Sequence, residues 1–407
     1  MQVKIRQISI LLCGLLPFMQ ATAQKEYKSI RSYLKAKNGN EAMKLVEKLQ
    51  TDSTFRLDPT LYDYGRQAQV LLNDALNEKA YLKQPYDTAQ LFMTTLQLCR
   101  YTLLCDSTER LLVNAGAGKA KYLKQNRQVL RRYHRNLGAG GRYFYAKKQY
   151  REAAECMDNY LSIPKSEIWG KDSLPVEMRE YTANAYVFQN SVFQLSDFTR
   201  VEKYKEYTMA DTAIRRSVIE LLARAAEGLQ HTPQMLQYLE QGLRENPSDV
   251  YFFTRLTDHY NSVEEYAKSL QLADTLLALY PDNLLYLASV SLSHLNMCHY
   301  KEAIQAAGHC LEIDSTLTEF HYYIGAAYCN LASEIVLPAN INSKSYKSLS
   351  KQQKDYYREA LPHLETYREA YPDDRKKWAP LLYRTYWALN MGKKFAEIEE
   401  VMNNLEK

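Results

Sequence analysis

An all-α fold made of successive helical hairpins is predicted by three features of this sequence. Residues of like character recur every 34 positions in the C-terminal half, as Pro247, Pro281 and Ser315 do. Within many segments the apolar residues stand three and four apart, the spacing that places them on one face of a helix. Glycine, which weakens a helix interior by roughly 1 kcal/mol relative to alanine, provides only 14 of the 407 residues. We therefore expect a right-handed superhelical α-solenoid of about eight or nine hairpins, an architecture that builds binding surfaces.

Residues 1–24 have the organisation of a secretory signal peptide. Two basic residues open the segment, and an apolar core over 8–18 follows that is too short to span a bilayer. The small residues of Ala21–Ala23 supply a cleavage pattern just before Gln24. We expect cleavage near Ala23 and Gln24 and export to the periplasm. The alternative interpretation is a buried N-terminal helix.

The mature chain is close to neutral. Loss of the two basic residues of the signal leaves 50 basic against 47 acidic residues, a net charge of +3, with both signs interspersed. This pattern lacks the clustered basic footprint of a nucleic-acid binder, and no other apolar run is long enough for a transmembrane helix. Six cysteines remain, which permits disulfides in an exported chain, although small buried thiols are the favoured interpretation. They are Cys99, Cys105, Cys156, Cys298, Cys310 and Cys329.

The N-terminal half of the mature chain is expected to be helical but irregular. Residues 25–132 are interpreted as divergent hairpins, because 41–49 and 61–82 place apolar residues at helical spacing. Residues 133–214 are interpreted as one better-defined hairpin followed by divergent helices, including one around 176–188. The residues that mark the better-defined hairpin are Gly141, Phe144, Ala153 and Pro164.

The most regular part of the sequence runs from 215 to 407. Its clearest unit, about 282–315, has a first helix, a turn around 297–299 and a second helix. Ser291 and Ala303 are expected to be small because the two helices cross closely there. The residues that face inward in this unit are Leu287, Val290, Ser291, His294, Ala303, Ala307 and Cys310.

These residues resemble the tetratricopeptide repeat (TPR) family, whose pattern is an aromatic residue, Leu-Gly, Tyr, Ala, a large apolar residue and a closing Pro. The resemblance is strong over 215–407, good over 133–165, and weak over 25–132 and 166–214. The chain also looks similar to exported TPR proteins of gram-negative gut bacteria. The resemblance implies a non-enzymatic scaffold that binds a protein or peptide in a concave groove. Further matching residues are Phe253, Leu256, Tyr260, Ala273, Pro281, Gly325, Tyr328, Ala360, Pro372, Trp378, Leu381, Leu382 and Ala396.

One repeat is interrupted by an insertion at about 334–354. The closing position is displaced by 23 residues, to Pro372, so we expect the first helix to end near Ser333 and the second to begin near Asp355. Insertions in repeats map to loops, often at a binding face, and they cost little entropy. The segment is therefore either a tolerated surface loop or a functional element. Its four lysines are Lys344, Lys347, Lys351 and Lys354.

The resemblance also places candidate binding residues, because the first helix of each TPR hairpin lines the groove. The Lys/Asn clamp by which some TPR domains hold a terminal carboxylate is absent, since other residue types occupy its positions. The alternative function is a glycan- or nutrient-binding accessory protein, in which Tyr251 and Tyr322 would stack on sugar rings. For any single groove residue, the alternative interpretation is an ordinary solvated side chain. The expected groove residues are Tyr251, Thr254, Asp258, Asn261, Asn296, Glu319, Tyr322 and Asn330, together with Ala288, Leu292 and Ala326.

No catalytic site, metal site or cofactor is predicted. The Gly-rich runs 116–119 and 138–141 lack the spacing of a phosphate-binding loop, and close helix packing explains the second run better. An enzyme with an unrecognised site remains a third alternative. The histidines that lack the spacing of a metal site such as H-E-x-x-H are His294, His299, His309 and His321.

Overall fold

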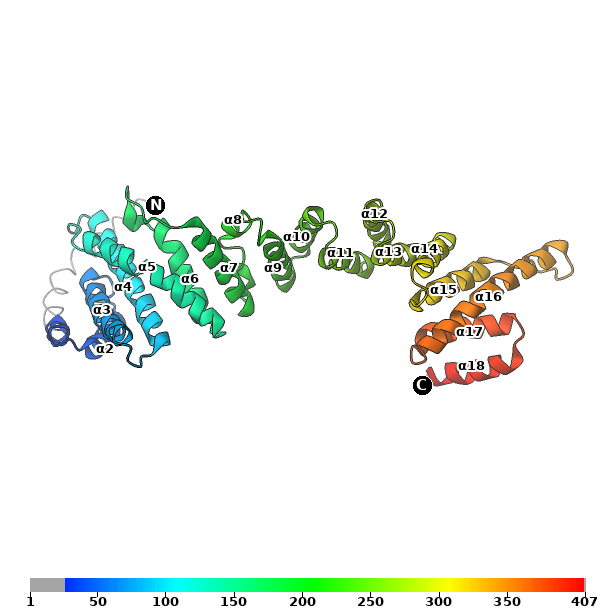
Figure 1. Cartoon of the computed structure of the whole chain (residues 1–407), viewed down its shortest axis with the longest axis horizontal. Coiled ribbons are helices and arrows are strands. Elements are labelled where there is room, and N and C mark those ends of the chain that lie inside the picture. Colours follow the sequence, from blue (N-terminus) through cyan, green and yellow to red (C-terminus); the bar gives the residue numbers. More distant parts are fainter. Residues whose placement is uncertain (1–25, 406–407) are drawn as a thin grey trace. The chain divides into compact units, whose positions relative to one another are not determined.

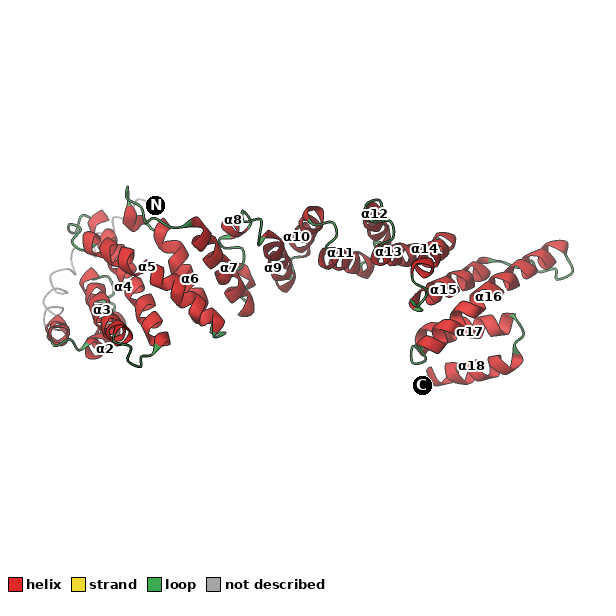
Figure 2. Ribbon diagram, viewed as in Figure 1, coloured by secondary structure: helices red, strands yellow, loops and turns green. Residues whose placement is uncertain are grey.

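The computed structural model describes residues 26–405, whose regular secondary structure is helical throughout (Figure 2). This confirms the predicted all-α class. The chain forms two compact units, Met1–Tyr238 and Leu239–Lys407, here called unit 1 and unit 2. The division falls within helix α10 (Thr232–Glu245). The expected signal peptide, residues 1–24, lies outside the described residues.

Unit 1 is built from helices that each pack on the next along the chain (Figure 1). Several begin at a capping side chain: Asn38, Asp58 and Asp87 each accept a hydrogen bond from a backbone N–H of the first turn. The helices predicted at 41–49 and 61–82 are confirmed. After a helix over residues 26–35, unit 1 contains α2 (Gly39–Gln50), α3 (Pro59–Tyr81), α4 (Thr88–Asn114), α5 (Leu123–Ala146), α6 (Tyr150–Ser162), α7 (Met178–Gln194), α8 (Lys205–Thr208) and α9 (Arg215–Gly228).

Helix length explains why unit 1 lacks a clear 34-residue period. Helices α3 and α4 have 23 and 27 residues, so this hairpin alone is longer than a repeat. Their contact also buries polar side chains: Asn73 Nδ2 donates to Thr94 Oγ1 and to Thr95 Oγ1, each at 2.9 Å. These bonds satisfy groups that would otherwise be buried without partners.

The glycines of 138–141 serve close helix packing, as the sequence predicts. A Cβ added at Gly141 would lie 2.6 Å from Met157 Cε of α6, and one at Gly138 would lie 2.8 Å from Asn184 Nδ2 of α7. Both separations are shorter than van der Waals contact allows, so only glycine lets α5 approach its two neighbours.

Unit 2 is a regular array in which each helix from α11 onward packs on the next, and α15 also contacts the first helices of the hairpins before and after it, α13 and α17. Helices α11 and α13 begin 34 residues apart, and so do α12 and α14. This is the TPR-type arrangement that the sequence period predicts. Its helices after α10 are α11 (Val250–Ser262), α12 (Tyr266–Leu277), α13 (Leu284–Asn296), α14 (Tyr300–Ile313), α15 (Glu319–Glu334), α16 (Lys344–Ala370), α17 (Arg375–Ala388) and α18 (Gly392–Leu405).

Small residues lie where the helices of a hairpin cross. Ser291 and Ala303 are both fully buried, and Ser291 Oγ donates a hydrogen bond to the Ala303 carbonyl at 3.1 Å. In the next hairpin a Cβ added at Gly325 would lie 2.6 Å from Leu364 Cδ2. The close crossing predicted at Ser291 and Ala303 is therefore confirmed, and the next hairpin has a similar one at Gly325.

The structure corrects the prediction for the interrupted repeat. Helix α15 ends at Glu334, close to the expected Ser333, but α16 begins at Lys344 rather than near Asp355. Ser343 caps this helix through a hydrogen bond from the Tyr346 N–H to its Oγ at 3.0 Å. Good helix formers then continue it, so the insertion is a loop over 335–343 followed by extra helix.

The cysteines of the described residues are free thiols, and five of the six are buried. Cys310 is fully buried, as predicted, and burial raises its pKa to about 11. Cys298, in the turn between α13 and α14, is exposed. Among the described residues we find no helix long and apolar enough to span a membrane.

Candidate partner-binding groove

The eight candidate residues all lie on first helices of unit 2, namely α11, α13 and α15. Two of these helices begin at side-chain caps. Asp249 accepts a hydrogen bond from the Tyr251 N–H at 3.0 Å, and Asn283 accepts one from the Leu285 N–H at 3.0 Å. The caps fix where each helix starts and therefore set the register of the side chains that follow. We call the surface formed by the eight residues the candidate groove.

Three candidate residues are exposed and polar. Asp258 lies near the end of α11, Asn296 is the last residue of α13, and Glu319 is the first residue of α15. Asn296 Nδ2 also donates to the Leu292 carbonyl at 2.9 Å. Ala288 and Leu292, which precede Asn296 on α13, are half-buried. The surface offers both carboxylates and apolar contact, a mixture typical of protein interfaces.

The other candidates also contribute to packing. Thr254 Oγ1 donates to the Val250 carbonyl at 2.8 Å, and Asn261 Oδ1 accepts from Ser269 Oγ of α12 at 2.8 Å. Asn330 is half-buried on α15. These residues support their own hairpins and leave only part of each side chain for a partner.

Both candidate tyrosines are half-buried. The Tyr251 ring packs edge-on against Phe252 with centroids 5.3 Å apart. The Tyr322 ring lies 5.2 Å from the ring of Tyr367 on α16, and Lys377 Nζ of α17 lies 5.5 Å from the Tyr322 centroid. Burial raises the pKa of Tyr322. These contacts reduce the ring area that a ligand can cover.

Ala326 does not line a groove. It is 4% exposed and belongs to the core cluster formed by α15, α16 and α17. Helix α15 packs closely on α16, and Ala326 is part of that core, so the groove register taken from α11 and α13 does not hold at this position.

One exposed residue in the same register was missed by the sequence analysis. Trp387 follows Asn330 by 57 residues, which is one repeat of 34 plus the 23-residue insertion. It lies in the last turn of α17 and is 70% exposed. Counting the repeat across the insertion would have found it. An exposed tryptophan matters because tryptophan is enriched at the energetic centres of protein interfaces.

The end of α16 is tied to the start of α17 beside Tyr322. Tyr367 Oη donates to Asp374 Oδ2 at 2.7 Å, and Lys377 Nζ pairs with the same oxygen at 3.1 Å. The hydrogen bond from Lys377 to Asp374 is the main reason that the pKa of Lys377 is raised. This contact positions a cation next to the candidate groove.

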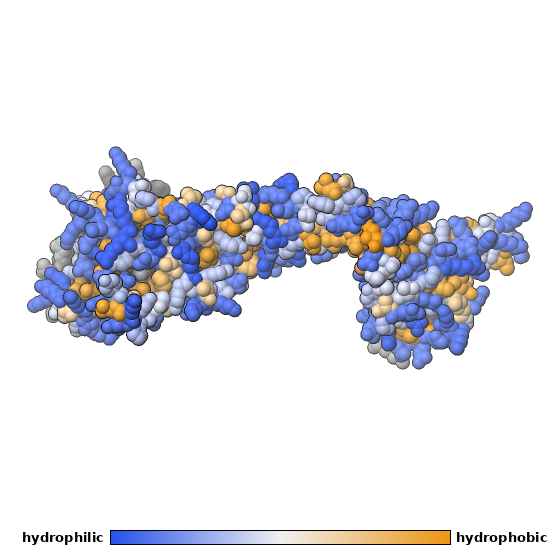
Figure 3. Space-filling view, viewed as in Figure 1, coloured by the Kyte–Doolittle hydropathy of each residue, from blue (hydrophilic) through white to orange (hydrophobic). Residues whose placement is uncertain are grey.

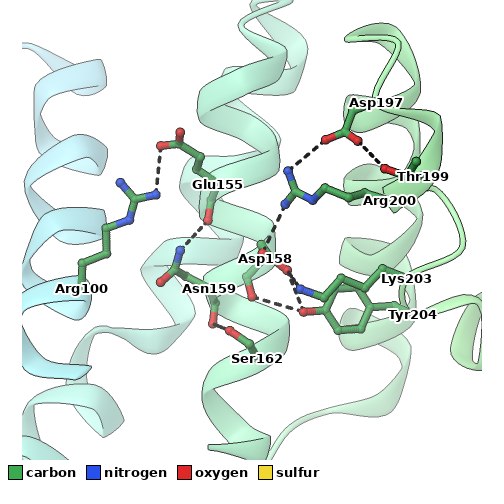
Figure 4. Close-up of polar contacts among 10 residues, drawn as sticks. All are labelled: Arg100, Glu155, Asp158, Asn159, Ser162, Asp197, Thr199, Arg200, Lys203 and Tyr204. Carbon is green, nitrogen blue, oxygen red and sulfur yellow. Dashed lines mark hydrogen bonds and ion pairs between the residues drawn. The ribbon is translucent and has the colours of Figure 1, made fainter. Parts of the chain in front are cut away.

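A second polar cluster, in unit 1, has a structural role. Asp158 of α6 accepts hydrogen bonds from Tyr204 Oη at 2.8 Å and Lys203 Nζ at 2.5 Å, and it pairs with Arg200 at 3.2 Å (Figure 4). Tyr204 has a left-handed backbone, φ 68°, which tertiary contacts must hold in place. The charges pair within the chain, and the cluster holds the irregular segment 196–208 against α6.

Four of the histidines form two pairs. His321 of α15 and His363 of α16 approach to 2.7 Å between Nδ1 atoms, and His294 and His299 to 3.4 Å. His309 Nε2 lies 3.6 Å from an Asp282 carboxylate oxygen. Within residues 26–405 there is no group of three or more His, Cys, Asp or Glu positioned to hold a metal ion. The rings of His321 and His363 lie 4.9 Å apart between centroids, at the contact of α15 with α16.

No protein-family model matches the chain, and no curated protein matches it either. Solved structures similar to it include the C-terminal part of a TPR repeat-containing protein from Cytophaga hutchinsonii, with a TM-score of 0.36, 11% identity, and coverage of 64% of this chain and 98% of that chain. The P58(IPK) TPR domain has a TM-score of 0.27 and 9% identity, covering 91% and 99%. The TPR2AB domain of yeast Sti1, in complex with pHSP90, has a TM-score of 0.23 and 11% identity, covering 63% and 97%. The TPR-type assignment rests on the helix order and the 34-residue period of the chain itself.

Proposed function

We propose that the protein is a non-enzymatic scaffold, exported to the periplasm, that binds a protein or peptide through the candidate groove of unit 2. The observation that carries this proposal is Trp387, which is 70% exposed at a groove position of a first helix. A large apolar ring left in water is unfavourable for an isolated chain, and covering it by a partner would be favourable. The exposed carboxylates of Asp258 and Glu319 would orient that partner.

A protein partner is supported over a glycan by the surroundings of the tyrosines. Stacking on a sugar ring needs an aromatic face that is open to the ligand. The neighbours of Tyr322, the Tyr367 ring and the Lys377 ammonium, cover part of its ring, and Tyr251 is half-buried beside Phe252. A partner that engages Trp387 and the exposed polar residues does not depend on those faces.

Export is proposed on the order of basic start, apolar core and small-residue cleavage pattern at the N-terminus. Cell fractionation together with N-terminal sequencing of the mature protein tests it. We expect a periplasmic protein that begins at or near Gln24. A cytoplasmic protein that retains the N-terminal segment would contradict this part of the proposal.

Binding is tested by capture on the immobilised mature chain, residues 25–407, from an envelope extract, with bound proteins identified by mass spectrometry. The test variant combines Trp387→Ala with Asp258→Ala. The control is Tyr81→Ala, which removes an aromatic side chain that is 87% exposed in unit 1. We expect one or a few proteins that the wild type and the control retain and the test variant loses. Equal capture by all three baits would exclude the candidate groove as the binding surface.

A further inference from the structure

The N-terminal part of α16 extends beyond the helix on which it packs. Helix α15 has 16 residues, whereas α16 has 27. Gln353 Nε2 donates to the Ala332 carbonyl, near the end of α15, at 2.9 Å. Residues of α16 before Gln353 therefore lie past the end of α15, as the ribbon in Figure 1 shows. We call residues 335–354 the basic tip; they comprise the loop after α15 and the first eleven residues of α16.

The extension carries a stripe of positive charge. Its lysines are spaced by three, four and three residues, which places them on one side of the helix. No carboxylate occurs between 335 and 354, and of the two flanking acids, Glu334 and Asp355, the second pairs with Arg358. The half-buried Tyr346, Leu349 and Gln353 lie on the opposite side of the helix. The lysines are Lys344, Lys347, Lys351 and Lys354, of which the first three are exposed and the last half-buried.

The loop of the basic tip exposes aliphatic side chains. Val336 is 85% exposed and Ile341 is 63% exposed. The turn around Ile341 is ordered, because the Asn342 N–H donates to Asn340 Oδ1 at 3.1 Å and Ser343 Oγ donates to the Asn340 carbonyl at 2.8 Å. An ordered turn thus holds Ile341 in water three residues before Lys344, the first lysine of the stripe, and Val336 lies earlier in the same loop. Figure 3 shows orange and blue residues side by side at this end of unit 2.

We propose that the basic tip docks on the surface of a bilayer that contains anionic phospholipid. Lysines attract such a surface through its negative potential, and aliphatic groups beside them gain by entering the interfacial region. The combination fits a lipid surface better than an acidic protein. All four cations are lysines, compact charges on flexible stems, and the stripe lacks the arginines that bind individual carboxylates in a fixed bidentate geometry. This docking is independent of the candidate groove.

The test is co-flotation of the full mature chain with phospholipid vesicles. One set is phosphatidylcholine alone, and the other contains about one third phosphatidylglycerol as the anionic lipid. The test variant changes the four lysines of the basic tip to glutamine, which keeps helix propensity. The control changes four exposed lysines of unit 1 to glutamine and so gives the same net charge. The control lysines are Lys28, Lys35, Lys48 and Lys124.

We expect the wild type to bind the anionic vesicles and not the neutral ones. Each lysine near an anionic surface contributes roughly a fivefold gain in partition, so the test variant should bind at least about 100-fold more weakly, while the control binds nearly as the wild type does. Circular dichroism checks that both variants keep their helices. Failure of the wild type to bind anionic vesicles, as expected if the tip contacts an acidic protein, would overturn the proposal. Equal weakening by both variants would overturn it too, because net charge alone would then explain binding.

The contribution of the loop is tested separately with Val336→Ser and Ile341→Ser combined. Because both side chains are exposed, the variant should fold as the wild type does. We expect several-fold weaker binding, and a greater loss of bound protein when salt is raised, because only the screened lysine contacts would remain. Unchanged binding at every salt concentration would refute insertion of the loop.

Discussion

Substitution of Gly325 by leucine tests the helix pairing of unit 2. A Cβ at this position would lie 2.6 Å from Leu364 Cδ2 and 2.7 Å from its Cγ, about 1 Å inside normal contact. Leu364 is fully buried, so it cannot move into solvent to make room. Overpacking of this kind costs about 1–3 kcal/mol, and the better helix propensity of leucine returns roughly 1 kcal/mol. We therefore expect a net loss of about 0–2 kcal/mol, in place of the gain of roughly 1 kcal/mol that leucine would give in an open helix.

The assay is urea unfolding followed by far-UV circular dichroism, with hydrogen exchange of α15 and α16 as a local readout. Gly308→Ala is the matched control, because Gly308 lies within α14 and a Cβ there would meet nothing within 4 Å. The control should gain roughly 0.5–1 kcal/mol through reduced chain entropy. If Gly325→Leu gains stability as the Gly308→Ala control does, and exchange in α15 and α16 is unchanged, the assigned crossing is wrong.

Three further predictions follow from contacts elsewhere in the chain. Burial lowers the pKa of His363 from 6.5 to about 4, so the stability that the neutral His363 contributes is full above about pH 6.5 and is lost as the pH falls toward 4. Allowing for solvent screening, the free energy of unfolding should fall by about 1–2 kcal/mol over this range. An equally steep decline in the His363→Gln variant would contradict this. Asp158→Asn should lower the free energy of unfolding by about 1–2 kcal/mol, since it weakens the contacts with Arg200 and Lys203. It should also speed proteolysis within 196–208, and an unchanged rate of digestion would show that Asp158 does not hold this segment. Among residues 26–405 only Cys298 is an exposed thiol, so one thiol per folded mature chain should react quickly with a thiol reagent. Cys298→Ser should abolish this fast phase. A fast phase that persists in the variant would show that a buried thiol is accessible.

The regular part of unit 2 could be predicted from sequence because each hairpin spans one repeat. Residues 34 apart occupy equivalent positions in successive hairpins, and the small residues Ser291 and Gly325, which are 34 apart, both lie where two helices of a hairpin cross. The 34-residue period does not predict the helices of unit 1, where individual helices are longer than those of a regular hairpin. Helices α3 and α4 are too long to show it.

The insertion shows a second limit of sequence reasoning. The sequence predicts that the second helix begins near Asp355, but the Ser343 cap starts it at Lys344, and α15 supports it through Gln353. A helix whose inner face packs only at one end gives a weak apolar pattern, so its extent follows from tertiary contacts. The same insertion displaces the 34-residue register by 23 residues, and for this reason the sequence pattern does not mark Trp387. The candidate groove itself stays a prediction.

The most direct test of the proposed scaffold is photo-crosslinking in cells that make the protein natively. A benzophenone amino acid is placed at Asp258, an exposed residue of the first helix α11, and separately at Gln271, an exposed residue of the second helix α12. The proposal predicts a discrete crosslinked protein from position 258 and none from position 271, with the product lost when Trp387→Ala is added. Crosslinking to the same protein from both positions, or from neither, would contradict a partner held in the candidate groove.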